Sequence, residues 1–408
     1  MPQHAAASAE DVDDDFAAWF RLLETPGLGR ETARRLLAAC GSPQAVLATP
    51  AATLRELLGH ALADALQQLP PHFHARLAAA RLWLQGGADR HLLTLGHPAW
   101  PALLLQTADP PLLLYVQGDL TCLAMPAVAV VGSRHPSAQG SDNAHSFAAD
   151  LAQAGWVVVS GMAQGIDAAA HEGAMKAGGR TVAVVGTGLD ITYPSRHRAL
   201  AQRIATQGAL VSEYAPGTPP LPEHFPQRNR LIAGLTRGTL VVEAALRSGS
   251  LITARLANEA GREVWAIPGS IHAPQSHGCH ALIKQGAMLV ESAQDVLNEL
   301  HSPGLWQAVL PLQATGSSAA RAGARTSAET GAETGAETGA ETSAHAAASP
   351  TPDDALLAAL GEDPVTLDAL LARTGESAAT LSARLLELEL AGQVARLPGG
   401  LYQRRHSA

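Results

Sequence analysis

The stretch that decides the fold is Ala127-Val128-Ala129-Val130-Val131-Gly132-Ser133-Arg134. Its fully apolar first five residues predict a strand that is covered on both faces. A glycine, a hydroxyl and a cation follow the strand directly. In open α/β sheets, ligands bind at the carboxyl ends of the strands, and the amides of such a turn and an arginine fork suit a phosphate oxygen. We therefore expect Gly132, Ser133 and Arg134 to contact phosphate.

Six further short apolar runs continue this pattern along the chain. They are Trp156–Ser160, Thr181–Val185, Ala209–Ser212, Thr239–Glu243, Glu263–Ile267 and Ala287–Val290. Between the first two predicted strands lies a helix that packs on one side, as shown by the spacing of Ala144, Phe147, Ala148, Leu151 and Ala152. Strands that alternate with helices predict an α/β fold with a doubly wound parallel sheet, which we assign to residues 127–300.

Length, composition and charge bound the possible functions. The chain has 408 residues, so we expect two or three domains at roughly 150 residues each. Only 4% of the residues are aromatic, and surfaces for stacking bases must therefore be scarce. The formal net charge of −9 argues against a protein covered in positive potential. Any nucleic-acid site must be local.

The three cysteines, Cys40, Cys122 and Cys279, are odd in number and far apart. This argues against a disulfide framework and favours a reducing compartment. Residues 1–15 are acidic and alanine-rich without a cationic apolar run, and no stretch of about 18 uncharged apolar residues occurs. We expect a cytoplasmic protein that does not contact a membrane.

The regions before the sheet differ in character from it. Residues 1–15 are predicted to be a disordered leader and residues 16–75 a small helical domain. Residues 76–126 are predicted to be a proline-rich connector or extension, made of extended structure and turns with some core, that leads into the sheet. In the helical domain, Pro26–Gly29 followed by Arg30–Leu37 is typical of a helix-hairpin-helix turn, whose amides can meet a phosphate. The same glycine turn also suits a module for helical packing or protein contact.

The regions after the sheet are a tether and a terminal module. Residues 301–351 consist mostly of small and polar residues, and Ala328–Thr342 repeats Ala-Glu-Thr-Gly. This composition predicts a flexible linker. Residues 352–405 have a winged-helix-like order of three helices and a hairpin with its tip at Pro398–Gly400. The segments are Asp353–Leu360, Thr366–Arg373, Ala378–Ala391 and Gln393–Gln403.

A second loop of the predicted sheet edge runs from Ser160 to Asp167 and contains Gly161 and Gly165. It adds backbone amides beside the first loop, and Asp167 can cap or charge the following helix. Asp167 and His171 are four residues apart, which is compatible with an acid/base pair. We favour a helix-stabilising pair or a buried polar link and assign no catalytic residue.

Two further stretches complete the predicted edge. Phe225-Pro226-Gln227-Arg228-Asn229-Arg230 precedes a short apolar helix, Leu231–Leu235, and its arginine forks and aromatic face suit phosphates and bases. Ser248-Gly249-Ser250-Leu251-Ile252-Thr253 opens another helix as a hydroxyl-rich anion cradle. Ordinary N-capping by Ser250 would explain one of its hydroxyls.

Other motifs are weaker. Gly186-Thr187-Gly188 lacks the third glycine of a dinucleotide fingerprint and is interpreted as a tight turn. His272, His277, Cys279 and His280 crowd one loop, but their spacing fits no ordinary zinc pattern. We therefore expect neither a cofactor nor a metal.

In their order and spacing, these motifs resemble the DNA-processing protein A (DprA/Smf) family. The resemblance spans roughly Leu92 to Leu300 and rests on Val131–Arg134, Ser160–Asp167 with His171, Gly188–Asp190 with Tyr193-Pro194, Ser212–Tyr214, Phe225–Arg230 and Ser248–Thr253.

The resemblance implies an extended Rossmann fold with an N-terminal domain similar to SAM or helix-hairpin-helix domains. It also implies sequence-independent binding of single-stranded DNA, a homodimer, and loading of the RecA recombinase in natural transformation, without a catalysed reaction. Carried over to this chain, the phosphate contacts fall on Gly132, Ser133 and Arg134 and on the loops Gly161–Gly165 and Ser248–Ser250. Arg228 and Arg230 would line the same basic pocket, beside Asn229 and Thr253.

The sequence departs from the family pattern at two places. Glu223 and His224 stand where relatives often have a basic residue, which predicts a weaker or pH-sensitive flank of the DNA path. The expected recognition helix of the terminal module carries Glu376, Glu387 and Glu389 against Arg384. Because this is a poor surface for a duplex, we favour a protein-contact or regulatory role for the module.

Two other functions compete with DNA binding. A nucleotide-processing enzyme of a related Rossmann-like family would need a Pro-Gly-Gly loop and a catalytic glutamate. Here Ser248-Gly249-Ser250 stands in the place of that loop, and Glu243 lies on the preceding strand. A transcription factor would act through the terminal module and bind a specific duplex.

Overall fold

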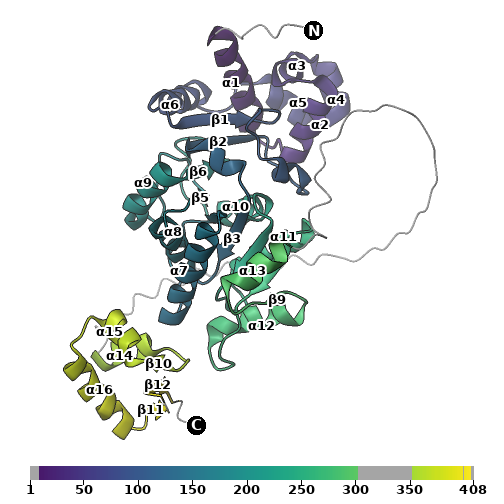
Figure 1. The fold of residues 1–408 in the computed structure, drawn as a ribbon. Coiled ribbons are helices and arrows are strands. Elements are labelled where there is room, and N and C mark those ends of the chain that lie inside the picture. The colour runs from purple at the N-terminus through teal and green to yellow at the C-terminus, as the bar shows by residue number, and fades with distance from the viewer. Residues whose placement is uncertain (1–8, 302–351, 398, 406–408) are drawn as a thin grey trace, which may run out of the picture.

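The computed structural model describes residues 9–301, 352–397 and 399–405. Figure 1 shows a small helical region near the N-terminus, a large central α/β body and a separate C-terminal module. The predicted linker, residues 301–351, lies outside the described residues except for His301.

Seven parallel strands form one continuous part of a nine-stranded sheet and include one of its edge strands. From one side to the other they are β6 (Ala209–Ser212), β5 (Thr181–Val184), β4 (Val157–Ser160), β3 (Ala127–Val131), β7 (Gly238–Val241), β8 (Glu263–Ala266) and β9 (Met288–Leu289). Each lies within two residues of its predicted bounds. The parallel sheet predicted from the apolar runs is confirmed.

Helices cover both faces of this sheet because neighbouring residues of each strand point to opposite sides. Val128 and Val130 pack against one layer, and Ala129 and Val131 against the other. The first layer contains α7 (Ala138–Gln153), α8 (Ile166–Lys176) and α13 (Ala293–Leu300), with α9 (Arg198–Gln207) over β5 and β6. The second contains α10 (His224–Gly234), α11 (Ser250–Glu259) and α12 (His277–Lys284).

The predicted connector, residues 76–126, is part of the sheet. It contains most of α6 (Phe73–Gln85), the strands β1 (Arg90–Thr94) and β2 (Leu113–Gly118), and the 3₁₀ turns Ala102–Gln106 and Leu120–Leu123. β2 pairs antiparallel with β6, and β1 with β2. The extended structure and turns predicted for this connector are present, because the prolines lie in the turns between the strands and leave both strands intact.

The N-terminal region contains α1 (Ala9–Glu24), α2 (Arg30–Cys40), α3 (Pro43–Ala48), α4 (Ala51–Leu58) and α5 (His60–Gln67). The prediction of a disordered leader is wrong for residues 9–15, which belong to α1, while residues 1–8 lie outside the described residues. Gly27 has a φ of 79°, so the predicted glycine turn needs a residue that tolerates the left-handed region. Phe20 of α1 and Phe73 of α6 pack together and join this region to the sheet.

The C-terminal module has the predicted winged-helix order. Its elements are α14 (Pro352–Leu360), β10 (Val365–Thr366), α15 (Leu367–Thr374), α16 (Ala378–Leu390), β11 (Val394–Leu397) and β12 (Leu401–Arg404). Arg373 of α15 contacts Asp142 of α7, with 2.8 Å between Nη2 and Oδ2, and also Gln139. The module therefore lies beside the first turns of α7 (Figure 1). None of the helices described here is long and apolar enough to cross a membrane.

Candidate nucleic-acid interface

A pocket of about 430 Å³ lies at the carboxyl end of β3. The order of the strands reverses here, because the chain runs from β3 to β4 on one side and later returns to β7 on the other. Such a switch point is the usual ligand crevice of an open α/β sheet. Nine of the predicted site residues line the pocket, namely Gly132, Ser133, Arg134, Arg228, Asn229, Ser248, Gly249, Ser250 and Thr253. We call this the phosphate pocket.

Three arginines and one carboxylate line the phosphate pocket. They are Arg134, Arg228, Arg247 and Asp167. Arg134 is exposed, and its guanidinium carbon lies 5.9 Å from the centre of the Phe225 ring. Arg247, also exposed, was missed by sequence reasoning, although a cation directly before Ser248-Gly249-Ser250 was a signal for it. The charges that face the pocket favour an anion.

Arg228 forms part of the pocket wall and is only 5% exposed. Its Nη1 donates a hydrogen bond to the carbonyl of Val184 at 2.6 Å, while Nε has no partner among the described residues. Burial lowers the pKa of Arg228, and the carboxylate of Asp167 acts against this shift. A buried donor without a partner is costly, and the guanidinium adds a positive charge to the wall of the pocket.

The loop from Gly161 to Gly165 lines the pocket at Ala163, whereas Gly161 and Gly165 themselves do not line it. The amides of Gly161 and Ala163 donate to Oδ2 of Asp167, both at 3.2 Å, so neither is available to a phosphate. A Cβ atom at Gly165 would lie 2.4 Å from the carbonyl oxygen of Ser133, which packs this loop against the first one. The prediction that the Gly161 amide contacts phosphate is therefore wrong, and Gly165 packs against the first loop outside the pocket lining.

His171 is buried and contacts a neighbouring strand. Its Nδ1 lies 2.7 Å from Oγ1 of Thr181, and burial lowers the pKa of the ring to about 3. The imidazole is therefore neutral near pH 7. Asp167 and His171 are both buried polar residues, as predicted, but each has its own partners.

The Ser248–Ser250 loop is held against α10. Nδ2 of Asn229 donates to the carbonyl of Gly249 at 3.3 Å, and the Ser248 and Ser250 hydroxyls lie 2.7 Å apart. The helix α11 begins at Ser250 and has no side-chain cap. Ordinary N-capping by Ser250 was therefore the wrong interpretation of this hydroxyl. Thr253 is buried one turn later.

Arg230 does not reach the phosphate pocket. The helix α10 begins at His224, so the predicted motif lies inside a helix and not before one at Leu231. Because Arg230 comes two residues after Arg228, it points to the opposite side of α10. There it forms ion pairs with Glu213 and Asp109. The prediction that both arginines line one pocket was wrong.

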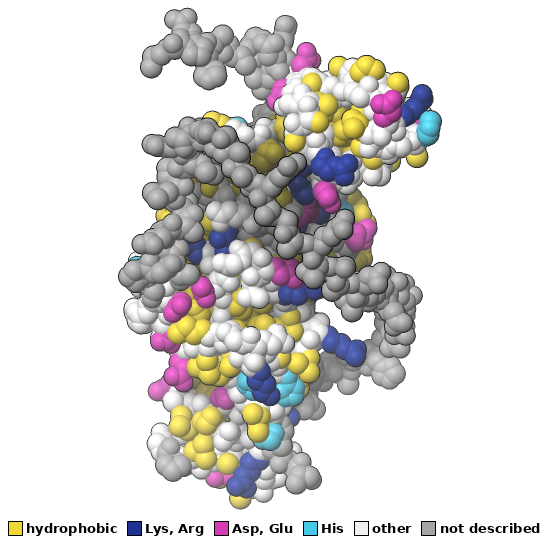
Figure 2. Space-filling view, turned by 90° about the vertical axis from the view of Figure 1, so that its right-hand side faces the viewer, with side chains coloured by type: hydrophobic (Ala, Val, Ile, Leu, Met, Phe, Trp, Pro, Cys, Tyr) yellow, Lys and Arg dark blue, Asp and Glu magenta, His cyan; other side chains and the backbone are white. Residues whose placement is uncertain are grey.

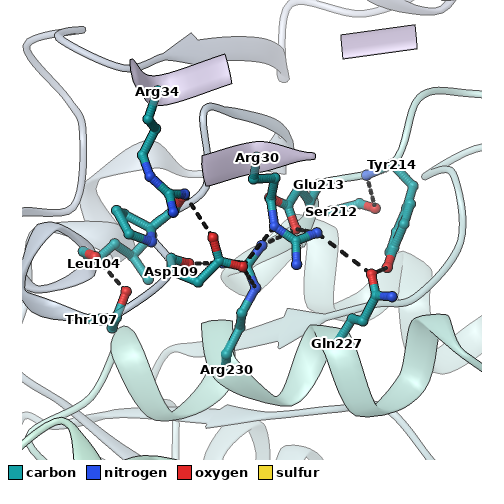
Figure 3. A network of polar contacts seen from close by, with 11 residues as sticks. Arg30, Arg34, Leu104, Thr107, Asp109, Ser212, Glu213, Tyr214, Gln227 and Arg230 are labelled. Carbon is teal, nitrogen blue, oxygen red and sulfur yellow. Dashed lines mark hydrogen bonds and ion pairs between the residues drawn. The ribbon is translucent and has the colours of Figure 1, made fainter. Parts of the chain in front are cut away.

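Asp109 is the centre of a polar network that joins three parts of the chain (Figure 3). Its carboxylate accepts from Nε of Arg30 and Nη1 of Arg34, both at 2.7 Å, and lies 3.4 Å from Nε of Arg230. Arg30 and Arg34 belong to α2, and Arg230 to α10. The network therefore ties the N-terminal helices to the helix that carries Arg228.

Residues that would support other chemistries have structural partners. Both carboxylate oxygens of Glu243 accept from Ser137, from its amide at 2.9 Å and its hydroxyl at 2.5 Å. Nε2 of His280 lies 3.0 Å from the carbonyl of Gly269, and Cys279 is buried. Within residues 9–301, 352–397 and 399–405, no group of three or more His, Cys, Asp or Glu residues could hold a metal ion.

The distribution of surface charge is compatible with a nucleic-acid site that is confined to one place. On the face shown in Figure 2, Lys and Arg side chains are scattered among acidic, hydrophobic and uncharged ones. A surface of this kind attracts nucleic acid only where cations converge. The phosphate pocket is such a place.

Comparison with known proteins identifies the family. A model described as "DNA recombination-mediator protein A" matches residues 91–301, and one described as "DprA winged helix domain" matches residues 340–400. Protein Smf from Escherichia coli is 40% identical over 326 residues, which cover 80% of each chain. The DNA processing protein DprA from Streptococcus pneumoniae is 52% identical over 200 residues, covering 49% of this chain and 71% of the relative.

A solved structure of DprA from S. pneumoniae has the same fold. It aligns with a TM-score of 0.62 at 38% identity and covers 70% of this chain and 97% of the solved one. Residues 91–301, which the family model matches, include nearly all of the sheet, both of its helical layers and the loops of the phosphate pocket. The chain belongs to the DprA/Smf family of DNA recombination-mediator proteins.

Proposed function

We propose that this protein binds single-stranded DNA without sequence preference in the phosphate pocket and acts as a recombination mediator that is not an enzyme. Its partners would be the RecA recombinase, which it loads onto the bound strand, and a second copy of itself. Membership of the DprA/Smf family supports the proposals of RecA loading and of a homodimer.

The convergence of three arginines with glycine and serine loops in one pocket carries this proposal. Such groups bind phosphate oxygens, and phosphate contacts hold a strand without reading its sequence. The Phe225 ring beside Arg134 offers a stacking surface, which every base can use. Together these contacts fit a single strand better than the paired bases of a duplex.

The C-terminal module supports a contact with protein. On α16, Leu386 and Leu390 are 55% and 81% exposed, and Glu387 is exposed beside them. Arg384 is paired with Glu376. The acidic charge of this helix face repels DNA phosphates, and its exposed leucines suit an apolar contact. We therefore assign this face to a protein partner.

The direct test is a mobility shift with single- and double-stranded oligonucleotides of unrelated sequence, with and without RecA. We expect single strands of all sequences to bind about equally, and RecA filaments to form faster on strands coated with this protein. Preference for one duplex sequence, or turnover of nucleotides by the pure protein, would contradict the proposal.

The Arg134→Ala variant tests the site itself. Each lost phosphate contact lowers the slope of log affinity against log salt concentration by about 0.7 for single strands. We expect this loss together with uniformly weaker binding of all sequences. An unchanged affinity and slope would show that DNA binds elsewhere.

A further inference from the structure

A second cavity, of about 680 Å³, lies between the N-terminal helices and the loop that follows β6. Its lining includes Leu28 and Arg30 from the glycine turn and α2, Tyr214 from the loop, and His224 and Gln227 from α10. We call it the α10 cavity. The phosphate pocket is lined by Phe225, Pro226, Arg228 and Asn229 of the same helix. The two cavities are thus separated only by the first turns of α10.

An aromatic pair lies at the α10 cavity. The rings of Tyr214 and His224 are stacked, with their centres 3.9 Å apart and their planes at 17°. Both side chains are partly exposed, and both line the cavity. In a chain with four tyrosines, a stacked pair at a cavity rim is a specific feature. Such a surface suits a flat ligand.

The charges of the α10 cavity are balanced, unlike those of the phosphate pocket. Arg30 lies 3.7 Å from Glu213, and Arg76 forms an ion pair with Glu24. All four residues line the cavity. Because each cation has a carboxylate beside it, this cavity does not favour a phosphate. It presents both donors and acceptors, as the edge of a nucleobase does.

Gln227 adds a directed polar group between the rings and Arg30. Its Oε1 accepts from the Tyr214 hydroxyl at 3.3 Å and from Arg30 at 3.5 Å. No described residue accepts from its Nε2, which leaves an amide donor beside the aromatic pair. Leu28, Leu112 and Leu221 supply apolar walls.

We propose that the α10 cavity is a base subsite: it takes one nucleobase of a single strand whose phosphates occupy the phosphate pocket. This inference rests on the function proposed above. A helix with its side chains is about 10 Å across, so a strand that crosses α10 reaches both cavities within a few nucleotides. The base stacks on an outer face of the stacked Tyr214–His224 pair, and its edge meets Gln227.

Photo-cross-linking tests the position of the base. Octanucleotides that carry 5-iodouracil at one position at a time are bound to the full chain, irradiated and mapped by mass spectrometry. We expect a cross-link to Tyr214 or His224 from one or two neighbouring positions only. Cross-links that avoid this pair at every position would overturn the base subsite.

Affinity as a function of length gives an independent readout. Tyr214→Ala should weaken octanucleotide binding by about 5- to 100-fold, the usual effect of losing one stacked base, with the salt slope unchanged. A dinucleotide, too short to cross α10, should bind the variant as it binds the wild type. Tyr214→Phe keeps the ring and should restore octanucleotide binding. His224→Ala provides a second variant in case Tyr214→Ala is unstable.

Failure of this inference is distinguishable from failure of the proposed function. If Arg134→Ala lowers the salt slope while Tyr214→Ala and His224→Ala leave octanucleotide affinity unchanged, the base subsite is wrong and the phosphate pocket stands. If neither Arg134→Ala nor Tyr214→Ala affects binding, both proposals fall. Titration with dAMP adds a third arm, since loss of dAMP binding in Tyr214→Ala without any effect on octanucleotides would mean a site for free nucleotides.

Discussion

Nη1 of Arg228 lies so close to Gly161 that a Cβ atom at position 161 would come within 1.9 Å of it. The glycine therefore makes room for the guanidinium. We predict that Gly161→Ala displaces Arg228 and weakens single-stranded DNA binding by about 10- to 100-fold, which is the range for losing a hydrogen bond to a charged group. Fluorescence anisotropy with a labelled oligonucleotide measures the loss.

A double-mutant cycle separates this mechanism from general damage. If Gly161 acts only by making room for Arg228, then Gly161→Ala combined with Arg228→Ala should bind no more weakly than Arg228→Ala alone. Additive losses would show that Gly161 contributes to binding in another way.

Arg247 is predicted to contact phosphate although sequence reasoning passed over it. Because it is an exposed cation that lines the phosphate pocket, Arg247→Ala should lower the salt slope by about 0.7. Arg255→Ala is the matched control. Arg255 is an exposed arginine on α11 that does not line this pocket and lies 3.7 Å from Glu259. Equal slopes for the two variants would remove Arg247 from the site.

The sheet and the position of the site could be predicted from the sequence for a local physical reason. A strand covered on both faces must be apolar throughout, as Ala127–Val131 is, and this pattern is visible in one short window. Glycines directly after such strands must lie at the carboxyl edge. Gly132 directly follows β3, and Gly249 lies in the loop that joins β7 to the next helix, so both could be placed at this edge from the order of the predicted elements.

The direction of individual side chains could not be predicted in this way. Arg228 and Arg230 look equivalent in the sequence, but the direction of each side chain depends on a carboxylate far away in the chain. That carboxylate is Asp167 for Arg228 and Asp109 for Arg230. Pro226 was a local signal that sequence reasoning missed, since proline is tolerated in the first turn of a helix and its presence does not delay the start of α10.

We predict that Arg230→Ala lowers stability and leaves the salt slope of DNA binding unchanged. Arg230 and Glu213 have side chains that are only 10% and 12% exposed, and removal of one partner from such a buried pair costs about 3 kcal/mol or more. Urea unfolding measures the loss. Arg134→Ala should give the opposite pattern, with normal stability and a lower slope. A lower slope for Arg230→Ala would place Arg230 at the DNA after all.

The network around Asp109 predicts a pH dependence of stability. Burial alone would raise the pKa of Asp109, but the guanidiniums of Arg230, Arg34 and Arg30 hold it below the usual value. A carboxyl whose pKa is lowered by folding contributes stability that is present above its unfolded pKa of about 3.9. This contribution is lost as the pH falls through the lower folded value. The difference in free energy of unfolding between wild type and Asp109→Asn should therefore be largest near neutral pH and shrink below about pH 4.

Asp64→Asn is the control for this experiment. Asp64 also accepts from an arginine, Arg55, at 2.9 Å, but their side chains are 48% and 45% exposed. Exposed pairs contribute about 0–1 kcal/mol because water screens them, so this variant should differ little from wild type at any pH. If the Asp109→Asn difference stays constant down to about pH 3, the three arginines do not act through the charge of Asp109, and the link between α2 and α10 must rest on packing instead.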